Sequence, residues 1–582
     1  MQFALIGVVG IVVLVAVSKF SKQLGVAAPL VLVVVGVAAS FIPGLPSPLE
    51  VPPWVILALV LPPLLYASAI QVPLLDFRRN IGTISALSVL LVIVTALIVG
   101  IVMHALLPRL DLADAVALGA IVSPTDAVAA TTVAKRLGLP ARLVTVLEGE
   151  SLVNDASSLV LLKSALAATA VTVQLANVAS QFVFSVVIAI VIGLTVGIVT
   201  VYVRARLDDP VLETAASFAV PFIAYLPTEE LGASGVLAVV VAGLYTGHNA
   251  ARRFSAQARI AERLNWRTVQ FVLENGVFLL MGMQLLTIVR QVQHDDARLG
   301  ATTAVLLGLG LCVLLLLIRA AFIVPLVLRL RARQRHAAEL GGRLSDGLDR
   351  VRRRPVPDDE GAHRRWARLT RYLERRSADV TEEAESPISW RGGAVLTWAG
   401  MRGVVTVAAA QSLPTDGSIP YRAQLILIAF TVALVTLLGQ GGTLPLVIRL
   451  LNVSGSDAAA DRRELAGLLE EISEAGLAVL EHPESQAGRG EQIDPAVVER
   501  VRQDTMLRVE AEWERVDIHE NEERQTGPHQ QYRALRALVL DAERQALLEA
   551  RSRGNYPSRV LSRAQVMLDF DESRMAQREE NP

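Results

Sequence analysis

The chain has 582 residues, of which 52% are hydrophobic and 19% are charged, and its mean hydropathy is +0.46. So apolar a composition excludes an ordinary soluble globular protein, and the single cysteine, Cys312, excludes an internal disulfide and a cysteine-rich metal site. The net charge of −1 excludes nothing, because it averages an apolar part with two charged stretches, residues 329–391 and 452–582.

Apolar runs recur outside the charged stretches, and at about 17–25 residues each has the length of a helix that spans a bilayer. The sequence therefore predicts an all-α polytopic membrane protein with about thirteen spans. We interpret the first run as a span and not as a cleaved signal peptide, because lysines follow it and no basic residue precedes it. The predicted spans are residues 3–18, 25–42, 53–71, 82–107, 112–134, 143–171, 178–203, 211–226, 232–248, 268–289, 301–328, 392–413 and 423–450.

Lysine and arginine are concentrated in every second loop between the predicted spans. Loops rich in these residues stay in the cytoplasm, so the alternation predicts a multi-pass protein of the plasma membrane with its N-terminus outside and its C-terminus in the cytoplasm. An odd number of spans fits this arrangement. The basic loops follow the first, third, fifth, seventh, ninth and eleventh spans and include Lys19, Lys22, Arg78, Arg79, Lys135, Arg136, Arg142, Arg204, Arg206, Arg252 and Arg253.

Two soluble parts accompany a transmembrane domain that covers residues 1–451. A cytoplasmic loop, residues 331–389, separates the eleventh and twelfth spans, and its charges and prolines predict disorder around one amphipathic helix near residues 366–373. Residues 452–582 show helical periodicity and predict a cytoplasmic helical tail, either regulatory or merely solubilising. Its apolar stripes are Leu465, Leu468, Leu469 and Ile472, then Leu535, Leu538, Leu540, Leu547 and Leu548, and helix is expected across Tyr532 to Met575.

Two of the predicted spans contain helix-breaking residues together with a charge. The fifth contains Ser123-Pro124-Thr125-Asp126, and proline removes a backbone donor and opens a helix. The twelfth contains Gly400-Met401-Arg402-Gly403, where two glycines flank an arginine. By the loop charges these spans run in opposite directions. Broken helices in two oppositely oriented halves are typical of an inverted-repeat secondary transporter with its site at the midplane, and two ordinary kinks are the alternative.

The sixth span carries acids where a membrane helix should be apolar. Glu150 and Asn154 are four residues apart, as are Ser151 and Asp155, so these polar side chains share one side of a helix. Intramembrane acids are typical of a cation or proton path, and oxygen donors without His or Cys favour a hard monovalent cation over zinc or copper. Thr125 and Asp126 can add oxygens from the opened fifth span.

Other polar residues of the spans have less definite interpretations. Arg402 needs an acid as its partner, because an unpaired guanidinium in hydrocarbon is costly. We expect Glu148 at the cytoplasmic mouth of the site and Lys163 to extend toward water. Glu274 either lines a cytoplasmic funnel or caps a helix. A purely structural polar network is the alternative to an ion site.

Three motifs in this order resemble those of the monovalent cation:proton antiporter family, in the bacterial type of its sodium/proton exchanger branch. They are Pro124-Thr125-Asp126, Glu150-Ser151-x-x-Asn154-Asp155 and Gly400-Met401-Arg402-Gly403, and the resemblance covers residues 1–450. It implies a thirteen-helix fold of inverted repeats with two broken crossing helices. It also implies a homodimer in which a six-helix core moves against a dimerisation domain. The loop from Arg329 to Trp390 is longer than the resemblance leads us to expect.

The resemblance also implies an activity: exchange of Na⁺ for H⁺ across the membrane by alternating access, one for one and electroneutral, as an Asn-Asp pair suggests. Asp155 would bind Na⁺ and a proton in turn, with Ser151, Thr125 and Glu150 as further Na⁺ ligands, Asp126 supporting the shell and Asn154 stabilising it. Arg402 would pair with Glu150. No cofactor and no nucleic acid is implied, and the partners are monovalent cations, protons and the lipid bilayer. Li⁺ or K⁺ as the cation, including a K⁺/H⁺ antiporter, stays open.

Two other classes of protein, an intramembrane protease and a channel, are alternatives to an antiporter. An intramembrane aspartyl protease would place its aspartates in Tyr-Asp and Gly-x-Gly-Asp, and neither context occurs in the chain. We therefore expect no enzyme. A cation channel would conduct without coupling to protons, and transport across vesicles with opposed ion and pH gradients separates the two.

Overall fold

The protein is described by a computed structural model, in which every regular element of the described residues is a helix. Residues 1–455 and 456–582 form two compact units, close to the boundary predicted at 451/452. The described residues are 2–24, 27–42, 52–126, 128–170, 175–207, 209–293, 299–353, 359–385, 388–415, 419–453, 458–480, 495–520, 535–536, 538–543 and 545–547.

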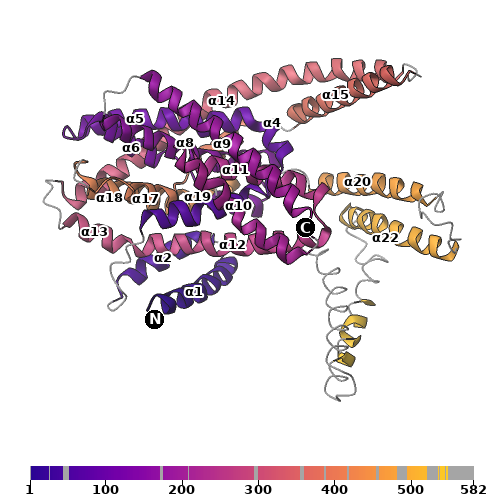
Figure 1. Ribbon diagram of the computed structural model, residues 1–582, viewed down its shortest axis with the longest axis horizontal. Coiled ribbons are helices and arrows are strands. Elements are labelled where there is room, and N and C mark those ends of the chain that lie inside the picture. The colour runs from indigo at the N-terminus through magenta and orange to yellow at the C-terminus, as the bar shows by residue number, and fades with distance from the viewer. Residues whose placement is uncertain are drawn as a thin grey trace. The chain divides into compact units, whose positions relative to one another are not determined.

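The first unit is a bundle of helices (Figure 1), several of which are interrupted. Its first half contains α1 (Gln2–Leu24), α2 (Ala28–Ser40), η1 (Val55–Val60), α3 (Leu61–Ala69), α4 (Leu74–Ser85), η2 (Ala86–Leu90), α5 (Leu91–Leu106), α6 (Leu112–Val122), α7 (Val128–Arg136), α8 (Ala141–Ala170) and α9 (Leu175–Arg204). Its second half contains α10 (Pro210–Glu230), α11 (Gly235–Arg253), α12 (Ala256–Met283), α13 (Leu285–Gln293), α14 (Ala301–Arg352), α15 (Glu360–Glu385), α16 (Trp390–Trp398), α17 (Val404–Gln411), α18 (Arg422–Val435), η3 (Thr436–Gln440) and α19 (Gly441–Leu451). The elements η1, η2 and η3 are π-helical turns within longer helices.

Each predicted span coincides with one helix or with a run of consecutive helices. Six helical stretches of the described chain are long and apolar enough to cross a membrane, by length and composition. The exact number of spans and the inverted repeat stay predictions. The six stretches are Leu74–Leu106, Ser180–Arg204, Pro210–Glu230, Ala256–Gln293, Ala301–Arg335 and Arg422–Leu451.

Apolar side chains cover the outside of the bundle as well as its interior. On α9, Val183, Val187 and Val191 are 59%, 50% and 54% exposed. Small residues bring the inner helices together, as at Gly36 of α2 and Gly282 of α12. A Cβ atom on Gly36 would lie 2.4 Å from the carbonyl oxygen of Leu279, and one on Gly282 would lie 2.3 Å from that of Val33. Close backbone contact at small residues is how helices associate in lipid, where apolar burial gives no driving force.

Both predicted helix breaks are confirmed, and they contact each other. α6 ends at Val122 and α7 begins at Val128, while α16 ends at Trp398 and α17 begins at Val404. The backbone N–H of Asp126 donates to the carbonyl oxygen of Met401 at 2.7 Å. Unwound backbone is tolerated within a membrane protein only where its polar groups find partners, and here each break supplies one for the other.

The loop between the eleventh and twelfth predicted spans is mainly helical in its described residues, which corrects the expected disorder. α14 continues to Arg352, and α15 returns beside it (Figure 1). Ala337 of α14 is 6% exposed, and Thr370 and Val380 of α15 are 8% and 5% exposed. The high overall charge of the loop gave no sign that α14 and α15 share these buried positions. Their burial stabilises the helical pair.

The second unit contains α20 (Ala458–Val479) and α22 (Pro495–Glu520), which pack against each other. Of the first predicted apolar stripe, Leu465, Leu468 and Ile472 are 47%, 52% and 56% exposed, whereas Ala466 is fully buried. Leu548 and most of the predicted helical stretch from Tyr532 to Met575 lie outside the described residues.

Candidate functional site

The unwound segment between α6 and α7 is bound to α8 through Thr125. The Thr125 hydroxyl donates to Glu150 Oε1 at 2.9 Å. Asn154 Nδ2 donates to the carbonyl and hydroxyl oxygens of Thr125, both at 2.9 Å. Glu150 and Asn154 are 2% and 1% exposed, so the polar face expected from the four-residue spacing packs on the break and fixes its position.

Glu150 forms a buried ion pair with Arg319 of α14. Arg319 Nη1 donates to Glu150 Oε1 at 2.5 Å and Nη2 donates to Oε2 at 2.9 Å, while Nε donates to the carbonyl oxygen of Leu396 at 2.9 Å. Each side chain is 2% exposed. A two-pronged contact of this kind is among the strongest hydrogen-bonded pairs. The prediction that Glu150 pairs with Arg402 is therefore wrong, because the partner of Glu150 is Arg319.

Arg402 binds backbone carbonyl groups at the two helix breaks. Its Nε donates to the carbonyl oxygen of Val122 at 3.1 Å, and its Nη1 donates to that of Gly400. Its own backbone N–H donates to the Thr436 hydroxyl at 3.0 Å. The last carbonyl groups of a helix have no partner within it and carry partial negative charge. The end of α6 thus supplies the counter-charge that was expected from an acid.

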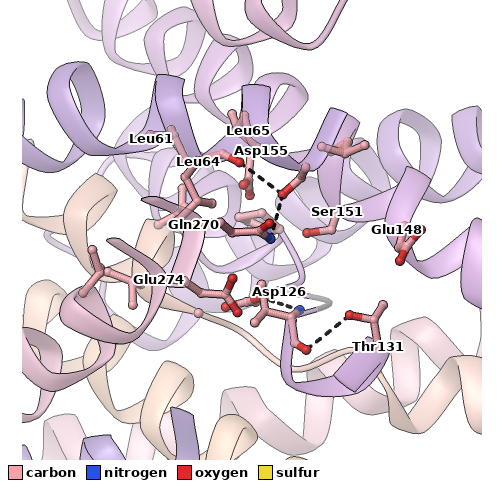
Figure 2. Close-up of a pocket in the computed structure, with 18 of the residues that line it drawn as sticks. Leu61, Leu64, Leu65, Asp126, Thr131, Glu148, Ser151, Asp155, Gln270 and Glu274 are labelled. Atoms are coloured by element: carbon pink, nitrogen blue, oxygen red, sulfur yellow. Dashed lines mark hydrogen bonds between the residues drawn. The ribbon is translucent and has the colours of Figure 1, made fainter. Parts of the chain in front are cut away.

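A cavity of about 300 Å³ lies beside this network, between α3 and α12 on one side and the α6–α7 break, α8 and the start of α17 on the other. Of the six predicted site residues, four line it: Thr125, Asp126, Ser151 and Asp155. Figure 2 shows Asp126, Ser151 and Asp155 around the same space. Glu150 and Asn154 are not on its wall, and both oxygens of the Glu150 carboxylate are already hydrogen-bonded.

Asp155 presents a carboxylate that has no ion pair or side-chain hydrogen bond with any described residue, although Asp155 is only 8% exposed. Asp126 Oδ1 accepts the backbone N–H of Val128 at 2.8 Å. Gly403 lies directly against Asp126, since a Cβ atom there would be 2.0 Å from Asp126 Oδ2. Asp155 is therefore the buried acid that is available to an ion.

Two further polar side chains line the cavity from α12. Glu274 lies across from Asp126, and Gln270 is one helical turn away from Glu274 (Figure 2). Glu274 lies well inside α12 and lines the cavity, so it does not cap a helix. Gln270 was missed, although its four-residue spacing from Glu274 was the same signal that was used in the sixth span.

The cavity reaches the surface at the end that carries the basic loops. Lys135 and Glu148 both line it and form an ion pair of 2.7 Å, and the Lys135 side chain is 64% exposed. Glu148 thus lies at the mouth, as expected. Toward the other end of α8, Lys163 pairs with Glu229 of α10 at 2.5 Å, and the Lys163 side chain is 57% exposed.

Arg319 is the residue of this network that the sequence analysis missed. It stands alone among apolar residues of the predicted eleventh span. Isolated charges inside a membrane helix are a signal of function or of a buried partner, and that rule would have singled out Arg319.

Comparison with known proteins gives consistent matches over the first unit. A family model described as the transmembrane sodium/hydrogen exchanger matches residues 9–450. An uncharacterized Na⁺/H⁺ exchanger of Mycobacterium bovis is 31% identical over 470 residues, which are 79% of this chain and 77% of that protein. The Na⁺/H⁺ antiporter ApNhaP of Aphanothece halophytica is 28% identical over 79% of this chain and 75% of its own length.

A solved structure shares the fold. The sodium proton antiporter MjNhaP1 of Methanocaldococcus jannaschii superposes with a TM-score of 0.55, over 78% of this chain and 100% of that chain. The sequence identity is 16%, so this likeness concerns the fold alone. The fold of this chain therefore has a counterpart among solved antiporter structures.

Proposed function

The chain belongs to the sodium/hydrogen exchanger family, and we propose that it is a secondary active antiporter that exchanges Na⁺ for H⁺ across the plasma membrane, one for one. The family is one of transporters and not of enzymes. The observation that carries the proposal is the Asp155 carboxylate, which is buried, faces the cavity and has no ion pair within the described chain. A buried carboxylate with no countercharge is stabilised when it takes up either a cation or a proton.

The Na⁺ ion would be held by oxygens of Asp155, Ser151 and Thr125, with Asp126 as a supporting ligand. All four residues line the cavity, and hard oxygen donors suit an alkali cation. Glu150 would hold Thr125 in position and would not bind Na⁺ itself, because Arg319 and Thr125 already occupy its carboxylate oxygens. Asn154 would hold Thr125 in place.

Transport would proceed by alternating access, with α6–α8 and α17 moving against α3 and α12. The cavity lies between these two groups of helices and reaches the surface beside Lys135. If basic loops are cytoplasmic, this conformation is open to the cytoplasm, the N-terminus lies outside and the C-terminus inside. The thirteen spans in inverted repeats, the six-helix core, the homodimer and a regulatory role of the tail belong to the same proposal.

The choice of cation has one supported alternative. A Bacillus pumilus protein that is 29% identical over 72% of this chain and 57% of its own length is named a sodium, potassium, lithium and rubidium/H⁺ antiporter. The oxygen donors of Asp155, Ser151 and Thr125 suit any alkali cation. K⁺ or Li⁺ exchange is therefore the second candidate, and a proton-independent channel is the rival of another class.

The test is exchange in proteoliposomes loaded at acidic pH. Addition of Na⁺, Li⁺ or K⁺ outside should raise the internal pH, and Asp155→Asn should abolish that rise while the protein still inserts and dimerises. Asp111→Asn, at an exposed residue before α6, is the matched control and should transport normally. Exchange at the wild-type rate in Asp155→Asn would refute the proposed site, and Na⁺ flux without proton movement would indicate a channel.

A further inference from the structure

A second cavity of about 470 Å³ lies at the N-terminal end of α8, and it shares no lining residue with the ion cavity. Three elements form it: the start of α4, the start of α8 and the C-terminal part of α15. We call it the arginine cavity, and its lining residues are Asp76, Arg78, Arg79, Asn80, Ala141, Arg142, Thr145, Arg376 and Asp379.

The arginine cavity has an excess of positive charge. Its wall holds four arginines but only two aspartates. Arg79 and Asp379 neutralise each other in an ion pair of 2.7 Å, and Arg142 Nε donates to Asn80 Oδ1 at 3.0 Å. Arg78 and Arg376 have no ion pair within the described chain. Guanidinium groups of α4 and α15 that have no ion pair in the described chain thus converge beside the start of α8.

The first turn of α8 adds to the positive electrostatic potential in the arginine cavity. α8 has 30 residues, and the backbone N–H groups of Leu143 and Val144 both bond to the carbonyl oxygen of Pro140. The N–H groups of Ala141 and Arg142 therefore precede the first intrahelical bond. The beginning of a helix carries partial positive charge and binds anions. The Thr145 hydroxyl, on the same wall, can donate one further hydrogen bond.

We propose that the arginine cavity binds a phosphate-bearing anion, either the headgroup of an anionic lipid or a free phosphate compound. Planar guanidinium forks bind phosphate oxygens in pairs, and the helix start and the Thr145 hydroxyl supply neutral donors. In the orientation proposed above the site faces the cytoplasm, where both sources occur. Binding itself does not depend on the exchange activity, so the two proposals can fail separately.

A bound anion would join the long loop to the transport helix. Arg376 belongs to α15, Arg78 to α4 and Arg142 to α8, and α8 also carries Asp155. A phosphate that contacts all three would hold α15 in place in addition to the ion pair of Arg79 with Asp379. The unusually long loop then has a structural purpose, which is to complete an anion site.

The first test uses inorganic pyrophosphate and the full-length protein in neutral detergent. Pyrophosphate should raise the unfolding midpoint at constant ionic strength. Arg376→Ala and Arg78→Ala should each weaken its apparent affinity about tenfold, as expected when one charge-assisted hydrogen bond is lost. Arg371→Ala, at an exposed arginine of α15 whose Nε donates to the carbonyl oxygen of Ala367, is the matched control and should bind normally.

The second test distinguishes a lipid source. Amide hydrogen exchange of residues 376–380 is compared in nanodiscs of phosphatidylcholine and of phosphatidylcholine with phosphatidylglycerol. Protection by phosphatidylglycerol that is lost in Arg376→Ala, without a pyrophosphate effect, assigns the site to a lipid headgroup. If neither probe has an effect, or if Arg376→Ala and Arg371→Ala respond alike, the proposal is overturned.

Discussion

At the scale of single residues, two acids of α8 that lie five positions apart have opposite surroundings. Glu150 is neutralised by Arg319 and accepts a further bond from Thr125. Asp155 faces the cavity without a countercharge from any described residue. Since a buried carboxylate is stable only when it is paired or neutral, Glu150 acts as a structural anchor, and we propose that Asp155 is the group whose occupant changes.

Competition at Asp155 gives a prediction about pH. If Na⁺ and H⁺ bind the same carboxylate, protonation lowers the fraction of sites that can accept Na⁺. The half-saturating Na⁺ concentration should therefore rise as the pH falls, by up to about tenfold per pH unit where the protonated form dominates. The measurement is the initial exchange rate against Na⁺ concentration at several symmetric pH values. A half-saturating concentration that does not change with pH would contradict competition.

The ion pair gives a prediction about stability. Removal of one member leaves a buried charge without its partner, at a cost of about 3–5 kcal/mol. Arg319→Ala should thus lower the thermal unfolding midpoint strongly, and adding Glu150→Ala should cost much less than addition predicts.

The same cycle with Arg402→Ala is the control for this prediction. Arg402 donates to the carbonyl groups of Val122 and Gly400, so its coupling to Glu150 should be smaller than that of Arg319. If the coupling energy of Arg402 with Glu150 were larger than that of Arg319 with Glu150, the ion pair between Arg402 and Glu150 that the motifs predicted would be supported instead.

At the scale of elements, Gly403 of one broken helix packs directly against Asp126 of the other. A Cβ atom there would meet Asp126 Oδ2 at 2.0 Å and Asp126 Cγ at 2.7 Å. Gly403→Ala should therefore displace Asp126, destabilise the protein by about 1–3 kcal/mol and weaken Na⁺ affinity. Exchange kinetics and thermal unfolding measure both effects. Gly439→Ala has no neighbouring atom within 4 Å and is the control; equal behaviour of the two variants would contradict the argument.

The sequence predicted the breaks because their causes are local. Pro124 opens its own helix, and Gly400 and Gly403 weaken theirs, whatever packs around them. The polar face of α8 was predictable for the same reason, since four-residue spacing is a property of one helix.

The partner of Glu150 could not be predicted in this way. Arg319 is 169 residues away in the sequence, and only the tertiary fold, in which α14 packs against α5, α16 and α18, brings the two residues together. Motif resemblance pointed to Arg402 instead, whose charge is met by backbone carbonyl groups that no side-chain pattern reveals. α15 was underestimated because its charge suggested disorder, whereas a few buried positions such as Val380 suffice to hold it.

At the scale of the whole molecule, the tail forms a compact unit separate from the residues that line the ion cavity. Truncation after Leu451 should therefore leave exchange measurable in proteoliposomes, with a shifted dependence on pH or ion concentration. Full-length protein at the same density in the vesicles is the control. Complete loss of exchange in a truncated protein that still inserts and dimerises would show that the tail is part of the transport machinery.

The charge carried through one transport cycle follows from how many carboxylates change their occupant. Asp155 with Na⁺ and Asp155 with a proton have the same net charge, Glu150 is neutralised by Arg319, and Asn154 has no proton to exchange. Exchange should then be one for one and insensitive to a membrane potential.

A cycle that moved one net charge would gain or lose about 2.3 kcal/mol per 100 mV, which changes the equilibrium ion ratio many-fold. The measurement is the steady-state pH gradient in vesicles that are clamped at 0 or −100 mV with K⁺ and valinomycin, after the cation test described above has shown that the protein does not exchange K⁺. Equal gradients support one-for-one exchange, whereas a gradient that follows the voltage would mean that a second acid of the cavity, Asp126 or Glu274, releases a proton in each cycle.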